Sequence, residues 1–166
     1  MRIGMPTART RRNSNRLLLF ARAAAAAPEA RPVQSAEQFP IVKSDEQWRR
    51  ELTGEQYRVL RRHGTERAGA SELNTEDRAG VFHCAGCGQE LFSSAGKFDS
   101  GTGWPSFFAP LPDALATRQD RGLLMRRTEV HCARCGGHLG HVFPDGPPPT
   151  GQRYCINGVA LRFEPR

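Results

Sequence analysis

The chain has 166 residues, of which 25% are charged and 38% are hydrophobic, so it is long enough for one folded domain with a buried core. Its formal charge of +7 would suit a nucleic-acid-binding protein, but the first 32 residues hold seven arginines and one acid, Glu29. The remainder carries 17 basic and 16 acidic residues, which argues against a nucleic-acid-binding surface on the folded part.

Residues 1–40 are predicted to be a targeting peptide or disordered leader followed by a linker. The segment is arginine-rich and passes from "RLLLF" into an alanine run that could hold a cleavage site. "TRR" before an apolar patch resembles a twin-arginine signal for periplasmic export, although Arg22 interrupts the patch. The composition also fits an organellar transit peptide, or an uncleaved tail on a cytoplasmic protein. No apolar run approaches the ~20 residues that span a bilayer, so the chain is not expected to be transmembrane.

Two short helices are predicted at the start of the folded domain, which we assign to residues 41–166. They cover roughly 45–51 and 54–63, and each follows a capping box in which Ser or Thr precedes Gln by three residues, "SDEQ" and "TGEQ". Gly64 is predicted to end the second helix.

From about residue 80 the sequence is typical of strands and turns. Short apolar segments such as "GVFHC", "TEVHC" and "LGHVF" are separated by Gly, Pro, Asp and Ser. We therefore expect a mainly β fold of antiparallel sheets, with "PDGPPPTG" as a loop because prolines cannot donate to a sheet ladder.

Four of the five cysteines form two Cys-x-x-Cys pairs, Cys84 with Cys87 and Cys132 with Cys135, separated by 44 residues. Glycine follows each pair, as a tight turn presenting two thiolates to one ion requires. Four thiolates form the closed tetrahedral shell of a structural zinc ion. Such an ion would tie two distant hairpins of a small β domain together.

Two other arrangements of these cysteines are possible from spacing alone. Both pairs could be redox dithiols or disulfides, which an exported protein could carry. "CARCGGHLGH" also has the spacing of a site with two cysteines and two histidines, His138 and His141, but that site would leave the first cysteine pair without a role.

Cys155 is the remaining cysteine, and a free cysteine is commonly a small buried hydrophobe. In an extended strand, however, Arg153, Cys155 and Asn157 share one face while Tyr154 and Ile156 share the other. A guanidinium next to the sulfur would favour the thiolate, which is the reactive form. The pattern therefore indicates a nucleophilic site.

An acid would be needed if this thiolate attacked a group whose leaving oxygen must be protonated. His138, His141 and Asp145 precede Cys155 by a loop of workable length. Histidine is the usual proton donor near neutral pH, and a carboxylate can hold an arginine or a histidine in place. Each of these residues alone is more often structural.

Three segments in order, "GTGWPSF", "HLGHVFPDGP" and "RYCINGVALRF", resemble the B-type methionine sulfoxide reductases, which act on the R epimer and repair oxidised proteins under oxidative stress. The resemblance covers some three quarters of the chain. It implies two antiparallel sheets stapled by the four-cysteine zinc site, with the short helices at the N-terminal end.

The resemblance also implies a role for each candidate site residue. Cys155 matches the nucleophile and Trp104 the aromatic wall for the substrate methyl group. The polar set of the pocket is matched by His138, His141, Asp145, Arg153 and Asn157. The division of proton transfer between the two histidines stays open at this point.

The implied reaction transfers the sulfoxide oxygen to Cys155 and leaves a sulfenic acid. Many relatives carry a resolving cysteine where this chain has Thr102, so an external thiol would have to regenerate Cys155. Thioredoxin, or glutaredoxin with a small thiol, is the implied reductant. Oxidised proteins or peptides are the implied substrates, and the enzyme is expected to be a monomer.

Two other functions remain to be distinguished from this one. A zinc-ribbon module could bind nucleic acid or a protein partner with Cys155 inert, although the charge distribution opposes nucleic acid. The same fold could also bind oxidised methionine without turnover, but a binding protein has no use for a nucleophile.

Overall fold

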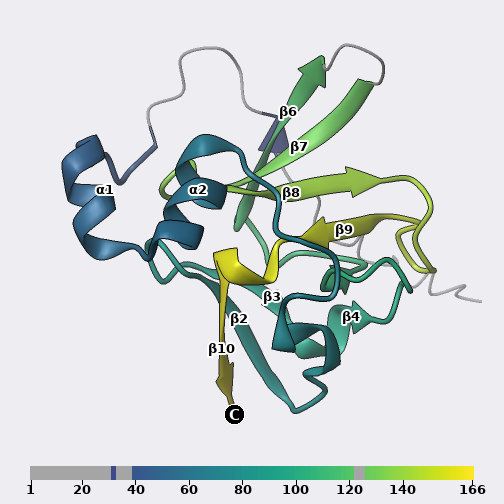
Figure 1. Cartoon of the computed structure of the whole chain (residues 1–166). Helices are drawn as coiled ribbons and strands as arrows, with labels where there is room; N and C mark the ends of the chain where they lie inside the picture. Colours follow the sequence, from purple (N-terminus) through teal and green to yellow (C-terminus); the bar gives the residue numbers. More distant parts are fainter. Residues whose placement is uncertain (1–30, 33–38, 122–125) are drawn as a thin grey trace, which may run out of the picture.

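The computed structural model describes residues 31–32, 39–121 and 126–166 (Figure 1). The helices in these residues are α1 (Asp45–Glu51) and α2 (Gly54–Arg62), with short 3-10 turns η1 (Glu72–Thr75), η2 (Ser94–Gly96) and η3 (Gly158–Ala160). The strands are β1 (Arg31–Pro32), β2 (Gly80–Cys84), β3 (Glu90–Ser93), β4 (Lys97–Phe98), β5 (Ser106–Phe107), β6 (Leu115–Arg121), β7 (Arg126–Cys132), β8 (His138–Phe143), β9 (Arg153–Ile156) and β10 (Leu161–Pro165). The predicted leader falls mostly on residues 1–30 and 33–38, outside the described residues.

Both predicted helices are present, and both begin at their capping boxes. The side chains of Ser44 and Thr53 accept from the third residue of α1 and α2, whose glutamine side chains return the hydrogen bond. Helix α2 ends one residue earlier than predicted, because His63 rather than Gly64 takes the left-handed cap conformation, with φ of 54°. That cap turns the chain toward the large sheet.

The strands form two sheets, as predicted. The larger has the order β1-β6-β7-β8-β9-β5-β4, and the smaller has the order β10-β2-β3. All pairings are antiparallel except that of β1 with β6, which places Arg31–Pro32 of the predicted linker at the edge of the larger sheet. Among the described residues, no helix is both long and apolar enough to cross a membrane.

The core lies where the two sheets meet. Phe82 of β2 and Phe92 of β3 both pack on Phe107 of β5, with ring centroids 5.0 and 4.2 Å apart. All three side chains are fully buried, so removing any of them would cost about 3–5 kcal/mol of stability. Helix α2 covers β8 and η3 and closes the core on one side (Figure 1).

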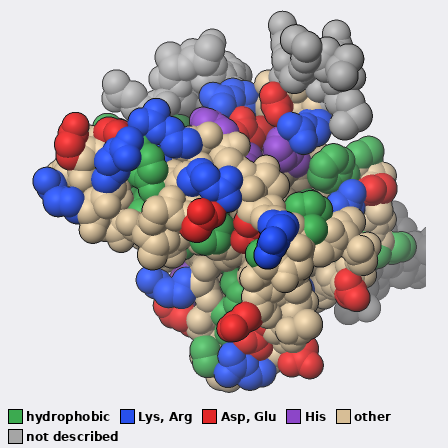
Figure 2. Space-filling model, viewed as in Figure 1, with side chains coloured by type: hydrophobic (Ala, Val, Ile, Leu, Met, Phe, Trp, Pro, Cys, Tyr) green, Lys and Arg blue, Asp and Glu red, His purple; other side chains and the backbone are tan. Residues whose placement is uncertain are grey.

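The face in Figure 2 carries basic and acidic side chains interspersed rather than segregated by sign. Histidines appear among them over the region of β6 and β7.

Candidate functional site

Strand register places Cys155 in the middle of the larger sheet, between two polar neighbours. Cys155 of β9 is paired with His141 of β8 on one side and with Ser106 of β5 on the other. Side chains directly opposite one another in an antiparallel pair share a face. The next pair outward, Glu129 of β7 with His141, continues this polar row away from Cys155.

A small pocket of about 140 Å³ opens beside the sulfur. It brings together four of the predicted site residues, Trp104, His141, Cys155 and Asn157, and is completed by Thr65, Arg127, Gly140 and Phe143. Sites for drug-sized molecules enclose roughly 300–1,000 Å³, so this pocket suits the end of a single side chain.

The predicted alternation along β9 is present. Tyr154 and Ile156 point into the core and are buried, whereas Arg153 and Cys155 are half-buried on the opposite face. Cys155 therefore lies at the wall of a pocket and is not a buried core cysteine.

Gly140 lets β8 and β9 approach closely at this point. A Cβ at Gly140 would lie 2.0 Å from the carbonyl oxygen of Cys155, a distance no real side chain tolerates. Any larger residue at position 140 would push β9, and with it the sulfur, away from His141.

Opposing effects set the pKa of Cys155. Burial raises it above the usual value for a thiol, while a hydrogen bond with the Thr102 hydroxyl and the positive charge of Arg153 act in the opposite direction. The net direction is upward because burial has the largest effect, while Arg153 favours the thiolate as the sequence predicts.

Arg153 is engaged mainly by Asp145. Its Nε and its terminal nitrogen contact the two carboxylate oxygens at 2.9 and 2.8 Å, and the guanidinium lies over the ring of Phe143 at 4.5 Å. The arginine lowers the pKa of Asp145. This bidentate pair fixes Arg153 beside Cys155 and explains why only part of its charge acts on the sulfur.

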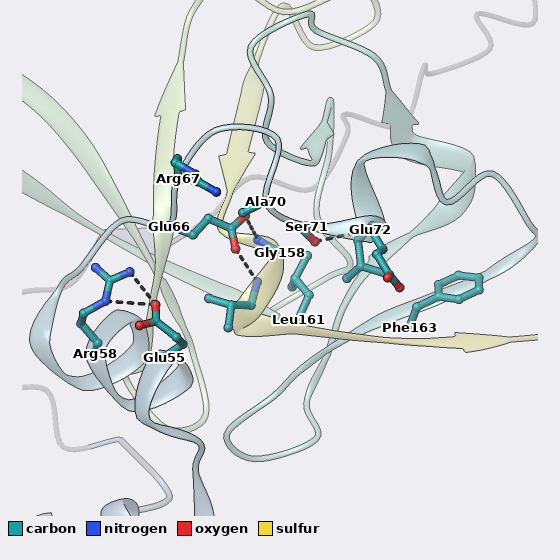
Figure 3. Close-up of a pocket in the computed structure, with 12 residues that line it drawn as sticks. Glu55, Arg58, Glu66, Arg67, Ala70, Ser71, Glu72, Gly158, Leu161 and Phe163 are labelled. Atoms are coloured by element: carbon teal, nitrogen blue, oxygen red, sulfur yellow. Dashed lines mark hydrogen bonds and ion pairs between the residues drawn. The ribbon is translucent and has the colours of Figure 1, made fainter.

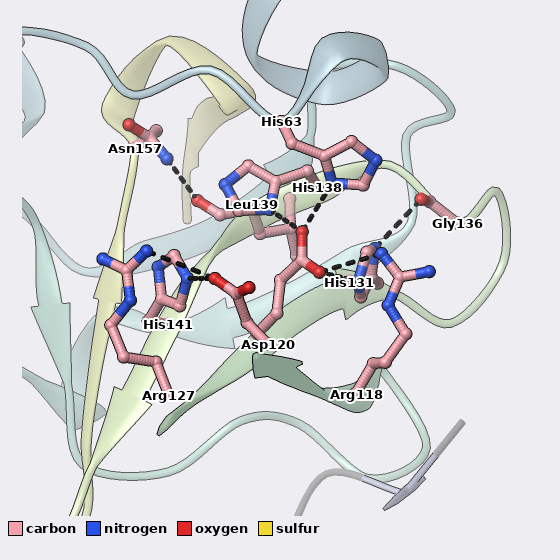
Figure 4. A network of polar contacts seen from close by, with 11 residues as sticks. His63, Arg118, Asp120, Arg127, His131, Gly136, His138, Leu139, His141 and Asn157 are labelled. Atoms are coloured by element: carbon pink, nitrogen blue, oxygen red, sulfur yellow. Dashed lines mark hydrogen bonds and ion pairs between the residues drawn. The ribbon is translucent and has the colours of Figure 1, made fainter. Parts of the chain in front are cut away.

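His141 is the histidine that lines the pocket. Its Nε2 lies 3.4 Å from an Asp120 oxygen, and Arg127 contacts the same oxygen at 3.2 Å (Figure 4). Burial, followed by the charge of Arg127, lowers the pKa of His141 although Asp120 opposes them. His141 is therefore mainly neutral at pH 7 and can exchange a proton at the pocket wall.

His138 lies behind this wall in a different environment. It is 1% exposed, and its Nδ1 contacts Glu129 Oε1 at 2.6 Å, an oxygen that His63 Nδ1 also contacts at 2.5 Å (Figure 4). Burial would raise the pKa of Glu129, but contacts from His131, His138 and His63 outweigh it and lower that pKa. The rings of His138 and His141 meet edge to face at 5.6 Å. His138 therefore contacts His141 but does not itself line the pocket.

The four remaining cysteines meet at the junction of the two sheets, where β2 and β7 end. Their sulfurs lie within 4.8 Å of one another, with 3.8 Å between Cys84 and Cys135 and 3.5 Å between Cys87 and Cys132. A tetrahedron with metal–sulfur bonds of about 2.3 Å has edges of about 3.8 Å. The donor set and its spacing therefore fit one tetrahedral metal ion.

The geometry disagrees with disulfide bonds and with a mixed cysteine and histidine site. All five cysteines are free, so neither Cys-x-x-Cys pair is a disulfide in this structure, and sulfurs of different pairs lie 3.5 and 3.8 Å apart, too far for a disulfide bond. His138 is bound to Glu129 and His141 to Asp120, so neither joins a mixed site with Cys132 and Cys135.

Several site residues were not found from sequence. Thr65, Arg127 and Asp120 come from separate parts of the chain and reach the site only through the packing of α2 and the pairing of β6 with β7. Arg127 and Asp120 have charged side chains suited to a polar pocket, but the sequence contains many arginines and aspartates, so these two could not be singled out. The strand "RRTEVHC" is mainly polar, so nothing in it distinguished Glu129 from its neighbours.

Comparison with known proteins agrees with this geometry. A family model described as the SelR domain matches residues 52–165. A peptide methionine sulfoxide reductase MsrB of Leifsonia xyli is 58% identical over 130 residues, which cover 77% of this chain and 94% of the relative. Proteins of the same name are 56% identical in Agrobacterium fabrum, over 75% of this chain and 93% of theirs, and 58% identical in Thiobacillus denitrificans, over 75% and 95%. The chain therefore belongs to the SelR-domain family of MsrB proteins.

Proposed function

We propose that the chain reduces methionine-R-sulfoxide in peptides and proteins to methionine, with Cys155 as the nucleophile. Membership of the MsrB family makes it an oxidoreductase of the peptide-methionine (R)-S-oxide reductase class. The observation that carries the residue assignment is the position of Cys155 in the wall of a side-chain-sized pocket, together with Trp104, His141 and Asn157.

The pocket offers a suitable surface to each part of a sulfoxide. The indole of Trp104 and the ring of Phe143 suit the methyl group, and Cys155 faces the electrophilic sulfur. His141, Arg127 and the amide of Asn157 supply polar groups for the oxygen. This division of the pocket is what we would expect of a site that holds one end of an oxidised methionine.

The proposed step transfers one oxygen atom and two electrons. The Cys155 sulfur attacks the sulfoxide sulfur and forms a sulfur–sulfur bond while the sulfoxide oxygen is protonated. The protonated oxygen then moves from the substrate sulfur to the Cys155 sulfur as the sulfur–sulfur bond breaks, so methionine leaves and Cys155 becomes a sulfenic acid. Because burial raises the pKa of Cys155, the thiol proton itself can pass to the oxygen by way of His141 as the sulfur attacks.

We assign proton transfer to His141 and a supporting role to His138. His141 lines the pocket with Cys155, whereas His138 is held by Glu129 and contacts only the edge of the His141 ring. Asp145 and Arg153 support the sulfur side of the pocket as a fixed ion pair.

Zinc is the ion that we propose for the four-cysteine cluster. Four thiolates with no fifth donor suit a structural zinc ion, which would supply cross-linking rather than chemistry. Cys84 and Cys87 flank the turn after β2, and Cys132 and Cys135 flank the turn between β7 and β8. The ion would join the small sheet to the large one.

Regeneration requires a thiol from outside the chain. The Thr102 hydroxyl hydrogen-bonds the Cys155 sulfur, so a cysteine at position 102 would be close enough to form a disulfide with Cys155. This chain has threonine there, and its other four cysteines lie together in the proposed metal cluster. Thioredoxin, or a small thiol with glutaredoxin, would condense with the sulfenic acid, release water and then reduce the mixed disulfide.

We also propose that residues 1–40 direct the protein to export or to an organelle.

The proposed function is tested by an assay on separated epimers of a blocked methionine sulfoxide, with dithiothreitol and then with thioredoxin. The R epimer should be reduced and the S epimer left unchanged, as in the R-specific class to which the chain belongs. The pocket would hold the methyl group, the oxygen and the peptide-bearing chain in three separate places, which only one epimer can fill at once. Reduction of the S epimer alone would contradict the assignment.

The fate of the sulfur gives a second prediction. After one equivalent of R sulfoxide without reductant, mass spectrometry with a sulfenic-acid trapping reagent should find Cys155 oxidised by one oxygen atom or as the trapped adduct. No intramolecular disulfide is expected, because Thr102 rather than a cysteine adjoins the sulfur. A disulfide between Cys155 and a cluster cysteine would refute the one-cysteine scheme.

A further inference from the structure

A loop that links α2 to η1 forms one side of the pocket, and Glu66 is its buried acid. The side chain is 7% exposed. Its two carboxylate oxygens accept hydrogen bonds from the backbone N–H groups of Gly158 and Val159, at 2.7 and 2.9 Å (Figure 3). Gly158 directly follows Asn157, so the carboxylate anchors the loop to the chain just beyond a pocket residue.

The backbone of Glu66 contacts the pocket residues themselves. Its N–H donates to Asn157 Oδ1 at 2.9 Å, and its carbonyl oxygen accepts from the indole Nε1–H of Trp104 at 3.2 Å. Asn157 Nδ2 also donates to the Leu139 carbonyl at 2.9 Å, so both ends of that amide are fixed. One residue therefore holds a polar wall and an aromatic wall of the same pocket.

We infer that Glu66 is the positioning residue that sets the orientation of Trp104 and Asn157 for substrate. A hydrogen bond from a backbone N–H to a carboxylate is stronger than one to a neutral acceptor, and Glu66 makes two of them. They hold the backbone of Glu66, whose N–H contacts Asn157 and whose carbonyl oxygen contacts Trp104. The inference rests on the proposed function only in taking these two side chains as the substrate contacts.

Close packing under the loop explains why this anchor is rigid. A Cβ at Gly158 would lie 2.0 Å from Ser71 Oγ and 3.3 Å from a Glu66 carboxylate oxygen. The loop thus lies directly against η3, with no room for a side chain between them. A surface groove of about 800 Å³ borders the same residues and shares Glu66 and Gly158 with this contact (Figure 3).

The test compares Glu66→Gln with the unaltered chain. Glutamine keeps one acceptor oxygen but turns an N–H group toward a backbone N–H, so one anchor bond is lost. We expect kcat/KM for an R-sulfoxide peptide to fall about tenfold or more, mainly through KM, because a misplaced Trp104 weakens substrate contact. The rate of Cys155 alkylation should change less than twofold, since the sulfur is held by other strands.

Nuclear magnetic resonance follows Trp104 without reference to activity. The chain has two tryptophans, so Trp48→Phe identifies the Trp104 indole signal. In the unaltered chain this N–H should exchange slowly with solvent, because it is bonded to the Glu66 carbonyl. In Glu66→Gln the signal should shift and exchange faster, while the Trp48 signal stays in place.

Glu55→Gln is the matched control. Glu55 borders the same groove but is exposed and pairs with Arg58 at 2.7 Å, so its substitution should alter neither KM nor the Trp104 signal. Glu66→Gln with a lower melting temperature but an unchanged Trp104 signal and KM would overturn the inference. If the unaltered chain failed to reduce either epimer, the proposed function would fail, whereas the Trp104 signal would still decide the role of Glu66.

Discussion

Cys155→Ser is expected to abolish sulfoxide reduction, with a loss on the order of 10⁴-fold or more in kcat. A serine hydroxyl is a far weaker nucleophile than a thiol. It also has no stable oxidised form equivalent to a sulfenic acid, so the substrate oxygen would have no acceptor. The two residues are nearly the same size, and the half-buried position should accommodate the change without disturbing β9.

The measurement is steady-state reduction of the R epimer, accompanied by metal analysis and a melting curve for each chain. Cys155→Ser should retain the same metal content and a melting temperature within a few degrees of the unaltered chain. It should also still bind a sulfoxide peptide, since Trp104, His141 and Asn157 are unchanged. More than about 1% residual kcat would refute Cys155 as the nucleophile.

Loss of the metal should have the largest effect on stability. Folding free energies of single domains are about 5–15 kcal/mol, and a structural zinc ion contributes on the order of 10 kcal/mol in small domains. Chelation of the metal, or Cys132→Ser, is therefore expected to lower the melting temperature by about 15 °C or more. Cys84 and Cys132 are fully buried, so the uncompensated thiols would remain inside the junction of the two sheets.

Elemental mass spectrometry should find one zinc ion for each chain, and circular dichroism should follow the change in melting temperature. Thiol titration of the denatured, chelated protein without reductant should count five free thiols. A count of one would establish two disulfides in place of the metal site. Cys155→Ser is the control, because it removes a cysteine outside the cluster and should leave the zinc content and the effect of chelation unchanged.

Local sequence determined the helices and the four-cysteine cluster nearly to the residue. A capping box satisfies backbone groups within one turn, so Ser44 and Thr53 mark the starts of α1 and α2 without help from the rest of the chain. The two Cys-x-x-Cys turns are equally local, with Gly88 and Gly136 in the left-handed conformation at φ of 74° and 69°. The end of α2 was less certain, and His63 rather than Gly64 took the left-handed cap.

The interior of the pocket depended on contacts between residues far apart in the chain. The spacing of His138 and His141 could not say which one faces Cys155, because Glu129 and Asp120 reach them only through the pairing of β6, β7 and β8. The pKa of Cys155 also depends on packing. The sequence identifies the charged neighbour Arg153, which lowers this pKa, but burial of the sulfur has the larger effect and raises it.

The sequence by itself determined the fold class, the cluster of four cysteines and the separate position of Cys155, because turn chemistry and strand alternation act over a few residues. Only the tertiary structure decided which histidine lines the pocket, and that Glu66 supports Trp104 and Asn157 from across the domain. The placement of the histidines and the contacts of Glu66 depend on desolvation and on hydrogen bonds between distant segments. Both effects arise only once the chain has packed.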